Sequence, residues 1–435
     1  MSDKKLEQDR KVATRRRILS GMGGVMAGGL IVSELPSGAR AAGNEPVKIG
    51  SSIPLTGFAA GDGEDMMRGF ELAISEINEM GGIFGRPLQL VSLDAGTFAP
   101  DVMVNNFRRL INEFKIDVYV GGYQLNTGPE FDIVAESNML YFHNNTIEAN
   151  AEAVRNNPDK YWMIFQHDPT EKWYSISLPG FLDGLEKSGV WKPINNKIAL
   201  INANNSYSAG LTKALREVIG KTKWEIGLVE EIVAPLTEWG PTLAKLRADP
   251  HAVIWVTDYF PGDLAAFTKQ FALDPTQSIL HQQYGPSVPE YLELAGSAGN
   301  GVTWASTLGT LPDDFGKGYV DRYTAKFGEK PGFSQGSGVY DAVHIYWQAA
   351  CLSGGNVSDR KRIASQVKRF PWRGVQGGRM FDQADQTARA FPDFTKDPSM
   401  GMPTVYVQIQ DGKHQVISPN PFTSGNFQLP PWFKK

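Results

Sequence analysis

The feature that most constrains this fold is the alternation of short apolar runs with segments of helical periodicity. Residues 252–256 (AVIWV) are apolar without alternation, which is typical of a parallel strand covered on both faces. Similar runs form two series, at residues 47–53, 88–93, 116–120 and 139–142, and at residues 197–203, 226–233, 252–257 and 277–280. Repeated strand–helix units favour right-handed crossovers and an open, doubly wound parallel sheet. The two series therefore predict an α/β protein with two lobes.

Composition narrows the possible partners and cofactors. The 435 residues carry 43 Lys and Arg against 47 Asp and Glu, a net charge of −4, without the basic excess that nucleic-acid binding requires. A single cysteine, Cys351, excludes a disulfide framework, a cysteine-based zinc site and an iron–sulfur cluster. The six histidines are scattered, without the spacing of metal ligands. We therefore expect no nucleic acid, no metal and no cofactor.

The N-terminal segment has the layout of an export signal. A polar start leads to residues 14–19 (TRRRIL), which resemble a twin-arginine motif, and an apolar, glycine-rich stretch covers residues 21–32. Residues 39–41 (ARA) provide the small residues of a cleavage site. No later run of 18 uncharged apolar residues follows. We expect residues 1–41 to be a twin-arginine-type signal peptide, cleaved near Ala41, and the protein to be periplasmic.

The loops that follow the predicted strands carry the candidate binding residues. In doubly wound sheets, ligands lie beyond the carboxyl ends of the strands. The side chains there are hydroxyls, amides and aromatic rings: Asn126, Thr127, Asn145, Thr146, Tyr207, Tyr259 and Tyr284. Such groups hold and orient a small ligand, whereas paired acids and bases are absent from the set. An alternative for the Asn and Thr residues is that they only satisfy the backbone of turns.

Several stretches in one order resemble the leucine/isoleucine/valine-type solute-binding proteins of ABC transporters. They include residues 49–57 (IGSSIPLTG), 77–85 (INEMGGIFG), 204–210 (NNSYSAG) and 338–342 (GVYDA). The resemblance covers nearly the whole chain after the export signal. It implies the type I periplasmic-binding fold, in which two doubly wound parallel-sheet lobes are joined by a three-strand hinge. It also implies a protein that is not an enzyme and that delivers a small molecule to a membrane permease.

The resemblance places the lobe boundaries at three hinge crossings, near residues 166, 303 and 404. Lobe one is expected over residues 46–166 with 304–404, and lobe two over residues 167–303 with the C-terminal part 405–435. We expect the protein to be a monomer whose lobes close over the ligand, since closure is driven by the ligand's preference for the closed state. The proline-rich C-terminus has no sheet pattern and is expected to lie on the surface.

The same resemblance assigns roles to the candidate residues. It implies that Asn126 and Thr127 in one loop, and Asn145 and Thr146 in the next, bind a ligand carboxylate through hydroxyls and backbone N–H groups. Tyr207 and Tyr259 match aromatic residues of the second lobe.

Two positions depart from the family pattern. The family's acidic residue for an α-ammonium group falls on Tyr284, and a first-loop aromatic residue is replaced near Ala60. A buried ammonium group without a carboxylate costs several kcal/mol. The sequence therefore predicts a neutral pocket for an amide, a urea-like compound, or an organic or aromatic acid, rather than a standard amino acid.

Two other functions remain open from the sequence. Residues 332–336 (GFSQG) match the nucleophile-elbow pattern of hydrolases around Ser334, with Asp341, Asp385 and His414 downstream in the right order. The polar turn before this motif lacks the strand that an elbow requires, which argues against a periplasmic serine hydrolase or amidase. A sensor that presents its ligand to a receptor kinase has the same sequence features as a transport protein.

Overall fold

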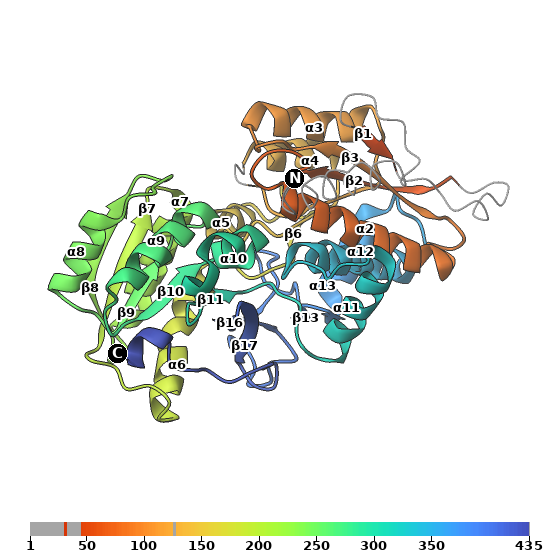
Figure 1. The fold of residues 1–435 in the computed structure, drawn as a ribbon. Coiled ribbons are helices and arrows are strands. Elements are labelled where there is room, and N and C mark those ends of the chain that lie inside the picture. The colour runs from red at the N-terminus through yellow and green to blue at the C-terminus, as the bar shows by residue number, and fades with distance from the viewer. Residues whose placement is uncertain (1–29, 33–44, 125–127, 435) are drawn as a thin grey trace, which may run out of the picture.

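The computed structural model describes residues 30–32, 45–124 and 128–434, and it arranges them in two lobes (Figure 1). Lobe one is built on a sheet with the strand order β1-β3-β2-β4-β5-β6. Its strands are β1 (Leu30–Val32), β2 (Val47–Ile53), β3 (Leu88–Asp94), β4 (Val118–Val120), β5 (Tyr141–His143) and β6 (Ile164–Gln166). All neighbours are parallel except the edge strand β1, which pairs antiparallel with β3.

Lobe two is built on a second sheet, with the order β17-β16-β11-β10-β9-β7-β8. Its strands are β7 (Lys197–Ala203), β8 (Glu225–Ile232), β9 (Val253–Val256), β10 (Ile279–Gln283), β11 (Thr303–Ser306), β16 (Val405–Gln410) and β17 (Lys413–Ser418). The first five strands are parallel, and β16 and β17 extend the sheet as an antiparallel hairpin. The predicted two-lobed α/β architecture is confirmed.

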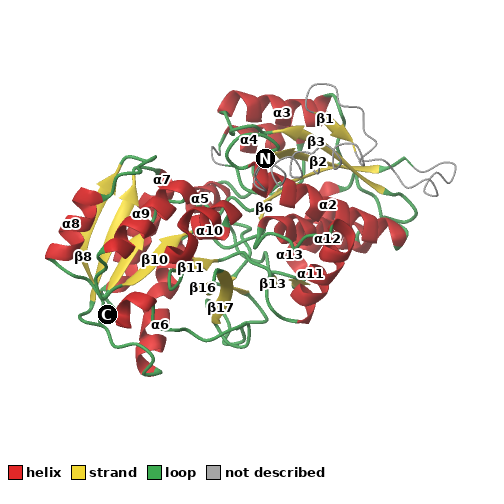
Figure 2. Ribbon diagram, viewed as in Figure 1, coloured by secondary structure: helices red, strands yellow, loops and turns green. Residues whose placement is uncertain are grey.

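Helices surround the strands of each lobe (Figure 2). Lobe one contains α2 (Ala60–Glu79), α3 (Pro100–Asn112), α4 (Pro129–Ser137), α5 (Glu148–Asn156), α11 (Asp314–Phe327), α12 (Gln335–Leu352) and α13 (Arg360–Arg369). Lobe two contains α6 (Lys172–Lys187), α7 (Ser206–Ile219), α8 (Gly240–Ala248), α9 (Pro261–Leu273) and α10 (Pro289–Ala295). Short 3₁₀ turns lie at Gly285–Ser287, Gly296–Gly299 and Pro431–Lys434, and two small ribbons pair β12 (Trp372–Gly374) with β13 (Gly377–Arg379) and β14 (Ala390–Phe391) with β15 (Met402–Pro403).

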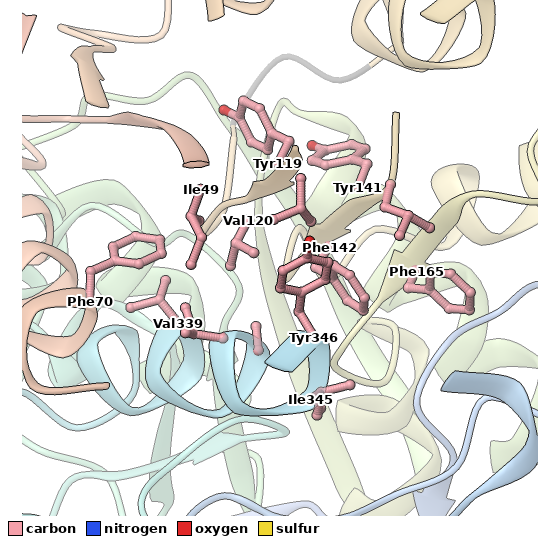
Figure 3. Close-up of a cluster of buried hydrophobic side chains, with 14 of the residues drawn as sticks. Ile49, Phe70, Tyr119, Val120, Tyr141, Phe142, Phe165, Val339, Ile345 and Tyr346 are labelled. Carbon is pink, nitrogen blue, oxygen red and sulfur yellow. The ribbon is translucent and has the colours of Figure 1, made fainter. Parts of the chain in front are cut away.

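The core of lobe one joins chain segments that are far apart in sequence. Figure 3 shows Val120 and Phe142, from β4 and β5, above Val339 and Tyr346 of α12. Helix α12 also crosses α2 at backbone contact, because a Cβ atom on Gly69 would lie 2.1 Å from the Gly336 carbonyl oxygen. Glycine is therefore required at this crossing, which fixes α2 and the loop before it against the rest of the lobe.

The chain passes between the lobes three times. It leaves sheet one after β6, returns to lobe one between β11 and α11, and enters sheet two again at β16. The expected second boundary, between residues 303 and 304, falls inside β11, whose residues all pair within sheet two. Lobe two therefore continues to Ser306, because β11 completes the parallel sheet before the chain crosses.

Buried polar contacts hold the first crossing against lobe one. The backbone N–H of Gln166 donates to Gln386 O (3.1 Å), and Ala388 N donates back to Gln166 O (2.8 Å). Beside them, Arg379 donates from Nε to the carbonyl of His167 (2.8 Å) and from a terminal nitrogen to Asp341 Oδ2 (2.6 Å). Both side chains of this ion pair are buried. The ion pair therefore anchors the first crossing to the part of lobe one that returns late in the sequence.

Residues near both ends of the chain pack against the lobes. Leu30–Val32, which lie within the expected export signal, form β1; the remaining signal residues lie outside the described part of the chain. At the other end, Trp432 is buried against Phe271, and its Nε1 donates to Ser278 O (2.9 Å). In the part of the chain that the structure describes, no helix is long and apolar enough to span a bilayer.

Candidate ligand-binding site

A cavity of about 370 Å³ lies between the two lobes, at the carboxyl ends of their strands. Lobe one lines it with residues that follow β2, β4 and β5, and lobe two with residues that follow β7, β9 and β10. These are the loops in which the sequence analysis placed the ligand, since parallel strands bring their carboxyl ends to one edge of a sheet. Five of the seven predicted residues line the cavity: Asn145, Thr146, Tyr207, Tyr259 and Tyr284. The other two, Asn126 and Thr127, lie outside the described residues.

The loop after β5 provides buried amides on the lobe-one side. Asn145 Oδ1 accepts a 2.5 Å hydrogen bond from the backbone N–H of Gln124, which fixes the side chain. Within the described residues, Asn145 Nδ2 and Asn144 Oδ1 are buried and have no hydrogen-bond partner. A buried polar atom without a partner is costly, and here both residues line a cavity. Each of these two cavity-lining residues thus has one buried amide atom beside the cavity without a protein partner.

Thr146 holds the same loop in place. Its φ of +55° is a left-handed conformation that non-glycine residues seldom adopt, and its hydroxyl donates to Asp168 Oδ2 (2.5 Å). Burial raises the pKa of Asp168 to about 8, while the bond from Thr146 lowers it. The Thr146 side chain therefore connects the ligand loop to the hinge, and its hydroxyl is engaged with Asp168.

Lobe two contributes aromatic rings. The ring centroids of Tyr207 and Tyr259 lie 6.0 Å apart in an edge-to-face arrangement, and Tyr259 and Phe260 lie 4.8 Å apart. The Tyr207 hydroxyl accepts a hydrogen bond from Gln283 Nε2 (2.9 Å), so its own proton is free for another acceptor. Asn205 caps α7 by accepting from Ser208 N (2.8 Å), which fixes the loop that carries Tyr207. These rings offer flat, apolar surface with hydroxyls at the edges.

The sequence analysis missed a charged residue in the cavity. Asp62, in the first turn of α2, lines the cavity and accepts hydrogen bonds at the same oxygen, Oδ2, from Tyr123 (2.8 Å) and Tyr284 (2.9 Å). Burial raises the pKa of Asp62 to about 6, which the two phenols partly offset. The cavity therefore contains a carboxyl group that the predicted neutral pocket did not include. The detectable signal was an aspartate at the end of the loop after β2, one of the strand-end loops already singled out.

The lobes are closed over this cavity. Tyr284, from lobe two, donates to Asp62 of lobe one and accepts from Gln335 Nε2 of lobe one (3.3 Å). The rings of Phe58 and Phe260, again from opposite lobes, lie 6.0 Å apart. Tyr284 has a φ of +48°, so its backbone is held in a strained conformation that aims the side chain across the crevice.

The structure does not assemble the alternative hydrolase site. Ser334 lies at the start of α12 after a stretch without a strand, so it is not at a strand-to-helix elbow. Asp341 and Asp385 are engaged by Arg379 and Arg155, and the His414 ring accepts from Trp304 Nε1 (3.3 Å). Among the described residues, no hydrogen bond joins Ser334 to a histidine, and no group of three His, Cys, Asp or Glu residues is arranged for a metal ion.

Two α/β lobes, three crossings and a closed cavity between strand ends define a receptor for small solutes. The chain matches the family model described as periplasmic binding protein over residues 46–392, and it belongs to that family. It is 38% identical to a candidate branched-chain amino acid ABC transporter from Silicibacter pomeroyi, whose structure has a TM-score of 0.84 and covers 89% of this chain and 100% of that one.

Two more distant solved structures share the fold, and a curated sequence matches most of the chain. A solute-binding protein from R. palustris in complex with benzoate is 17% identical, with a TM-score of 0.68, and covers 88% of this chain and 98% of its own. A branched-chain amino acid transporter substrate-binding protein from Streptococcus pneumoniae, in complex with isoleucine, is 20% identical with a TM-score of 0.68 (86% and 100% covered). The Leu/Ile/Val-binding protein homolog 8 of Brucella melitensis is 24% identical over 86% of this chain and 90% of its own length.

Proposed function

We propose that this protein traps a small organic molecule between its lobes outside the cytoplasm and delivers it to an ABC permease. The observation that carries the proposal is the closed cavity, which both lobes line and across which Tyr284 bonds to Asp62 and Gln335. A permease that contacts both lobes distinguishes the closed form from the open one. The protein changes its shape around the ligand and returns the ligand chemically unaltered.

We propose a flat ligand with amide-type polar groups. Seven aromatic residues line a volume of about 370 Å³: Phe58, Tyr123, Tyr174, Tyr207, Tyr259, Phe260 and Tyr284. The unpartnered Oδ1 of Asn144 and Nδ2 of Asn145, in residues that line the cavity, are one acceptor and one donor, which matches the N–H donor and carbonyl acceptor of an amide or a urea-like compound. An organic or aromatic acid is a second candidate, but the carboxylate of Asp62 disfavours it.

We further propose that the protein is exported through the twin-arginine pathway, is cleaved near Ala41 and acts as a periplasmic monomer. The support is the motif at residues 14–19 and the family of the chain. Replacing Arg15 and Arg16 together by lysine is expected to leave the protein in the cytoplasm. A matched change of Lys4 and Lys5 to arginine serves as the control, because these cations lie outside the motif. Size-exclusion chromatography of the exported protein tests the monomer.

Ligand binding is tested on purified protein in two steps. Native mass spectrometry detects a co-purified small molecule, and a thermal-shift panel of amides, ureas, aromatic acids and amino acids then ranks the classes. The proposal predicts at least one compound that raises the unfolding temperature and is recovered unchanged. If the protein converts that compound, or if leucine and valine bind best, the proposed function or its ligand class is wrong.

A further inference from the structure

We infer that the Asp62 carboxylate accepts a hydrogen bond from an N–H group of the ligand, and that the site rejects carboxylic acids that have no N–H group. This inference rests on the proposed function, because it assigns the ligand class of the same cavity. It also places the charged group that recognises the ligand at a different position from the one that the family resemblance implied. The position expected to carry an acidic residue holds Tyr284, whereas the carboxylate comes from the opposite lobe, at the start of α2.

The first step is that the two carboxylate oxygens of Asp62 differ in their hydrogen bonds. Tyr123 and Tyr284 both donate to Oδ2, at 2.8 and 2.9 Å, and among the described residues Oδ1 accepts no hydrogen bond. No cation of the described chain forms an ion pair with this carboxylate. A partly buried carboxylate that has no positive partner, and one oxygen to which no described residue donates, is a group that a ligand donor stabilises.

The second step is a hydrogen-bonded chain that links Asp62 to the free amides. From Asp62 it runs through the Tyr284 hydroxyl to Gln335 Nε2 (3.3 Å), and from Gln335 Oε1 to Asn144 Nδ2 (3.4 Å). Two amide atoms then have no hydrogen-bond partner among the described residues: Oδ1 of Asn144 and Nδ2 of Asn145. One side of the cavity is thus lined by the Asp62 carboxylate and by two amide residues, each with one buried atom that has no protein partner. The acceptors favour N–H groups, and the single donor favours one carbonyl.

The third step is the cost of the wrong ligand. A ligand carboxylate placed in this cavity meets Asp62 at short range in a poorly solvated space, and one of the two charges must then be neutralised by a proton. Asp65, one helical turn along α2, adds to the negative potential at Asp62. Tyr123 and Tyr284, which also face Asp62, are neutral donors and supply no positive charge.

Three compounds of one size test the inference: benzamidine, benzamide and benzoate. They share a flat ring and differ only in whether the planar end group is a cationic N–H donor, a neutral N–H donor or an anion. In the wild-type protein, calorimetry is expected to give benzamidine and benzamide at least about tenfold tighter binding than benzoate. In the Asp62→Asn variant, the affinity for benzamidine is expected to fall about tenfold. The affinity for benzoate is expected to rise toward that for benzamide.

Asp101→Asn is the matched control, because Asp101 also lies in the first turn of a lobe-one helix but is exposed and outside the cavity. It is expected to reproduce the wild-type order. The inference is overturned if benzoate binds wild type as tightly as the other two, or if Asp62→Asn preserves the wild-type order. It is also overturned if none of the three binds while the thermal-shift panel yields a ligand, an outcome that leaves the proposed function intact. Failure of the whole panel overturns the proposed function instead.

Discussion

The two walls of the crevice differ in chemistry. Lobe one provides Asp62 and the amides of Asn144 and Asn145, each fixed by hydrogen bonds or buried beside the strands. Lobe two provides mainly the rings of Tyr207 and Tyr259, which contact each other at their edges. Hydrogen bonds are directional and an unmatched partner is costly, whereas aromatic surface is tolerant of ligand shape. From this difference we expect lobe one to select the ligand and lobe two to cover it.

The largest expected effect is a loss of unfolding free energy when the pH is raised. It comes from acidic groups near the lobe-one wall and the hinge. Burial raises the pKa of Glu130 to about 7, and those of Asp168 and Glu171 to about 8. In the folded state these groups keep protons that the unfolded chain has released at its lower pKa values. Their stabilisation is complete below the carboxyl pKa values of the unfolded chain, near 4, and is lost progressively as the pH rises from there to the folded-state values of about 7 to 8.

Denaturant unfolding at pH 6.5 and pH 8.5 is therefore expected to show a loss of about 3 kcal/mol, since each unit of pKa shift corresponds to about 1.4 kcal/mol. Below pH 6.5 buried histidines act in the opposite direction, because burial lowers the pKa of His143 and of His281 to about 3. The histidine contribution therefore changes mainly below pH 6.5, so the comparison of pH 6.5 with pH 8.5 reports chiefly on the carboxyl groups. The variant Asp168→Asn should flatten the alkaline side, and an unchanged alkaline slope would show that Asp168 ionises normally.

Asn145→Ala is expected to have the next largest effect, on binding and stability together. It removes the acceptor of the Gln124 N–H and an amide nitrogen that is buried beside the cavity without a partner. Losing one partner of a buried hydrogen bond costs about 1–3 kcal/mol, so unfolding free energy should fall by about 2 kcal/mol and affinity by about 10- to 100-fold. Isothermal calorimetry with the best compound of the panel measures the second quantity.

The control is Asn157→Ala, which removes an exposed amide at the end of α5. It should change affinity less than about twofold, as surface substitutions usually do. Wild-type affinity in Asn145→Ala would mean that the lobe-one amides do not select the ligand.

Tyr259→Ala tests the lobe-two wall and is expected to have a smaller effect. Its ring is partly exposed and contacts Tyr207 and Phe260, so the fold loses little when it is removed. Aromatic contacts contribute about 0.5–1.5 kcal/mol beyond burial, which predicts a loss of affinity of about tenfold. Tyr259→Phe should retain nearly all of the affinity, because lobe two acts through the ring. Equal losses in the two variants would assign the role to the hydroxyl and contradict the comparison of the walls.

The sequence predicted the lobe-two wall better than the lobe-one wall, for a physical reason. Apolar strands followed by loops mark the crevice, and large aromatic residues in those loops, such as Tyr207, stand out from turn residues. Asp62 did not stand out, because an acidic residue in the first turn of a helix is ordinary and stabilises the helix end. Its place in the cavity depends on Tyr123 and on Tyr284, which is 222 positions away.

Other features depended on long-range pairing in the same way. The bounds of β2 and β7 agree with the sequence prediction, since each is bordered by turn residues. The end of lobe two at Ser306 was not visible, because β11 is recognised only by its pairing with β10 and β16. The role of Asn126 and Thr127 remains a prediction, since these residues are not described.

The smallest expected effect comes from removing one phenol hydroxyl beside Asp62. It compares the two walls most directly, because each lobe contributes one tyrosine to this carboxylate. Tyr123 and Tyr284 donate to the same oxygen of Asp62 at nearly the same distance, but Tyr123 belongs to lobe one and Tyr284 to lobe two. Removing either hydroxyl costs about 1 kcal/mol of hydrogen bonding. Only Tyr284→Phe removes bonds that join the lobes, since Tyr284 also accepts from Gln335.

Small-angle X-ray scattering of the ligand-free protein should therefore show a larger radius of gyration for Tyr284→Phe than for wild type, and an unchanged one for Tyr123→Phe. Affinity should fall about threefold in Tyr284→Phe, because part of the ligand's binding free energy must then close the lobes. If both variants open the protein equally, the effect comes from the charge of Asp62 rather than from the bond between the lobes. In that case lobe one controls closure as well as selection.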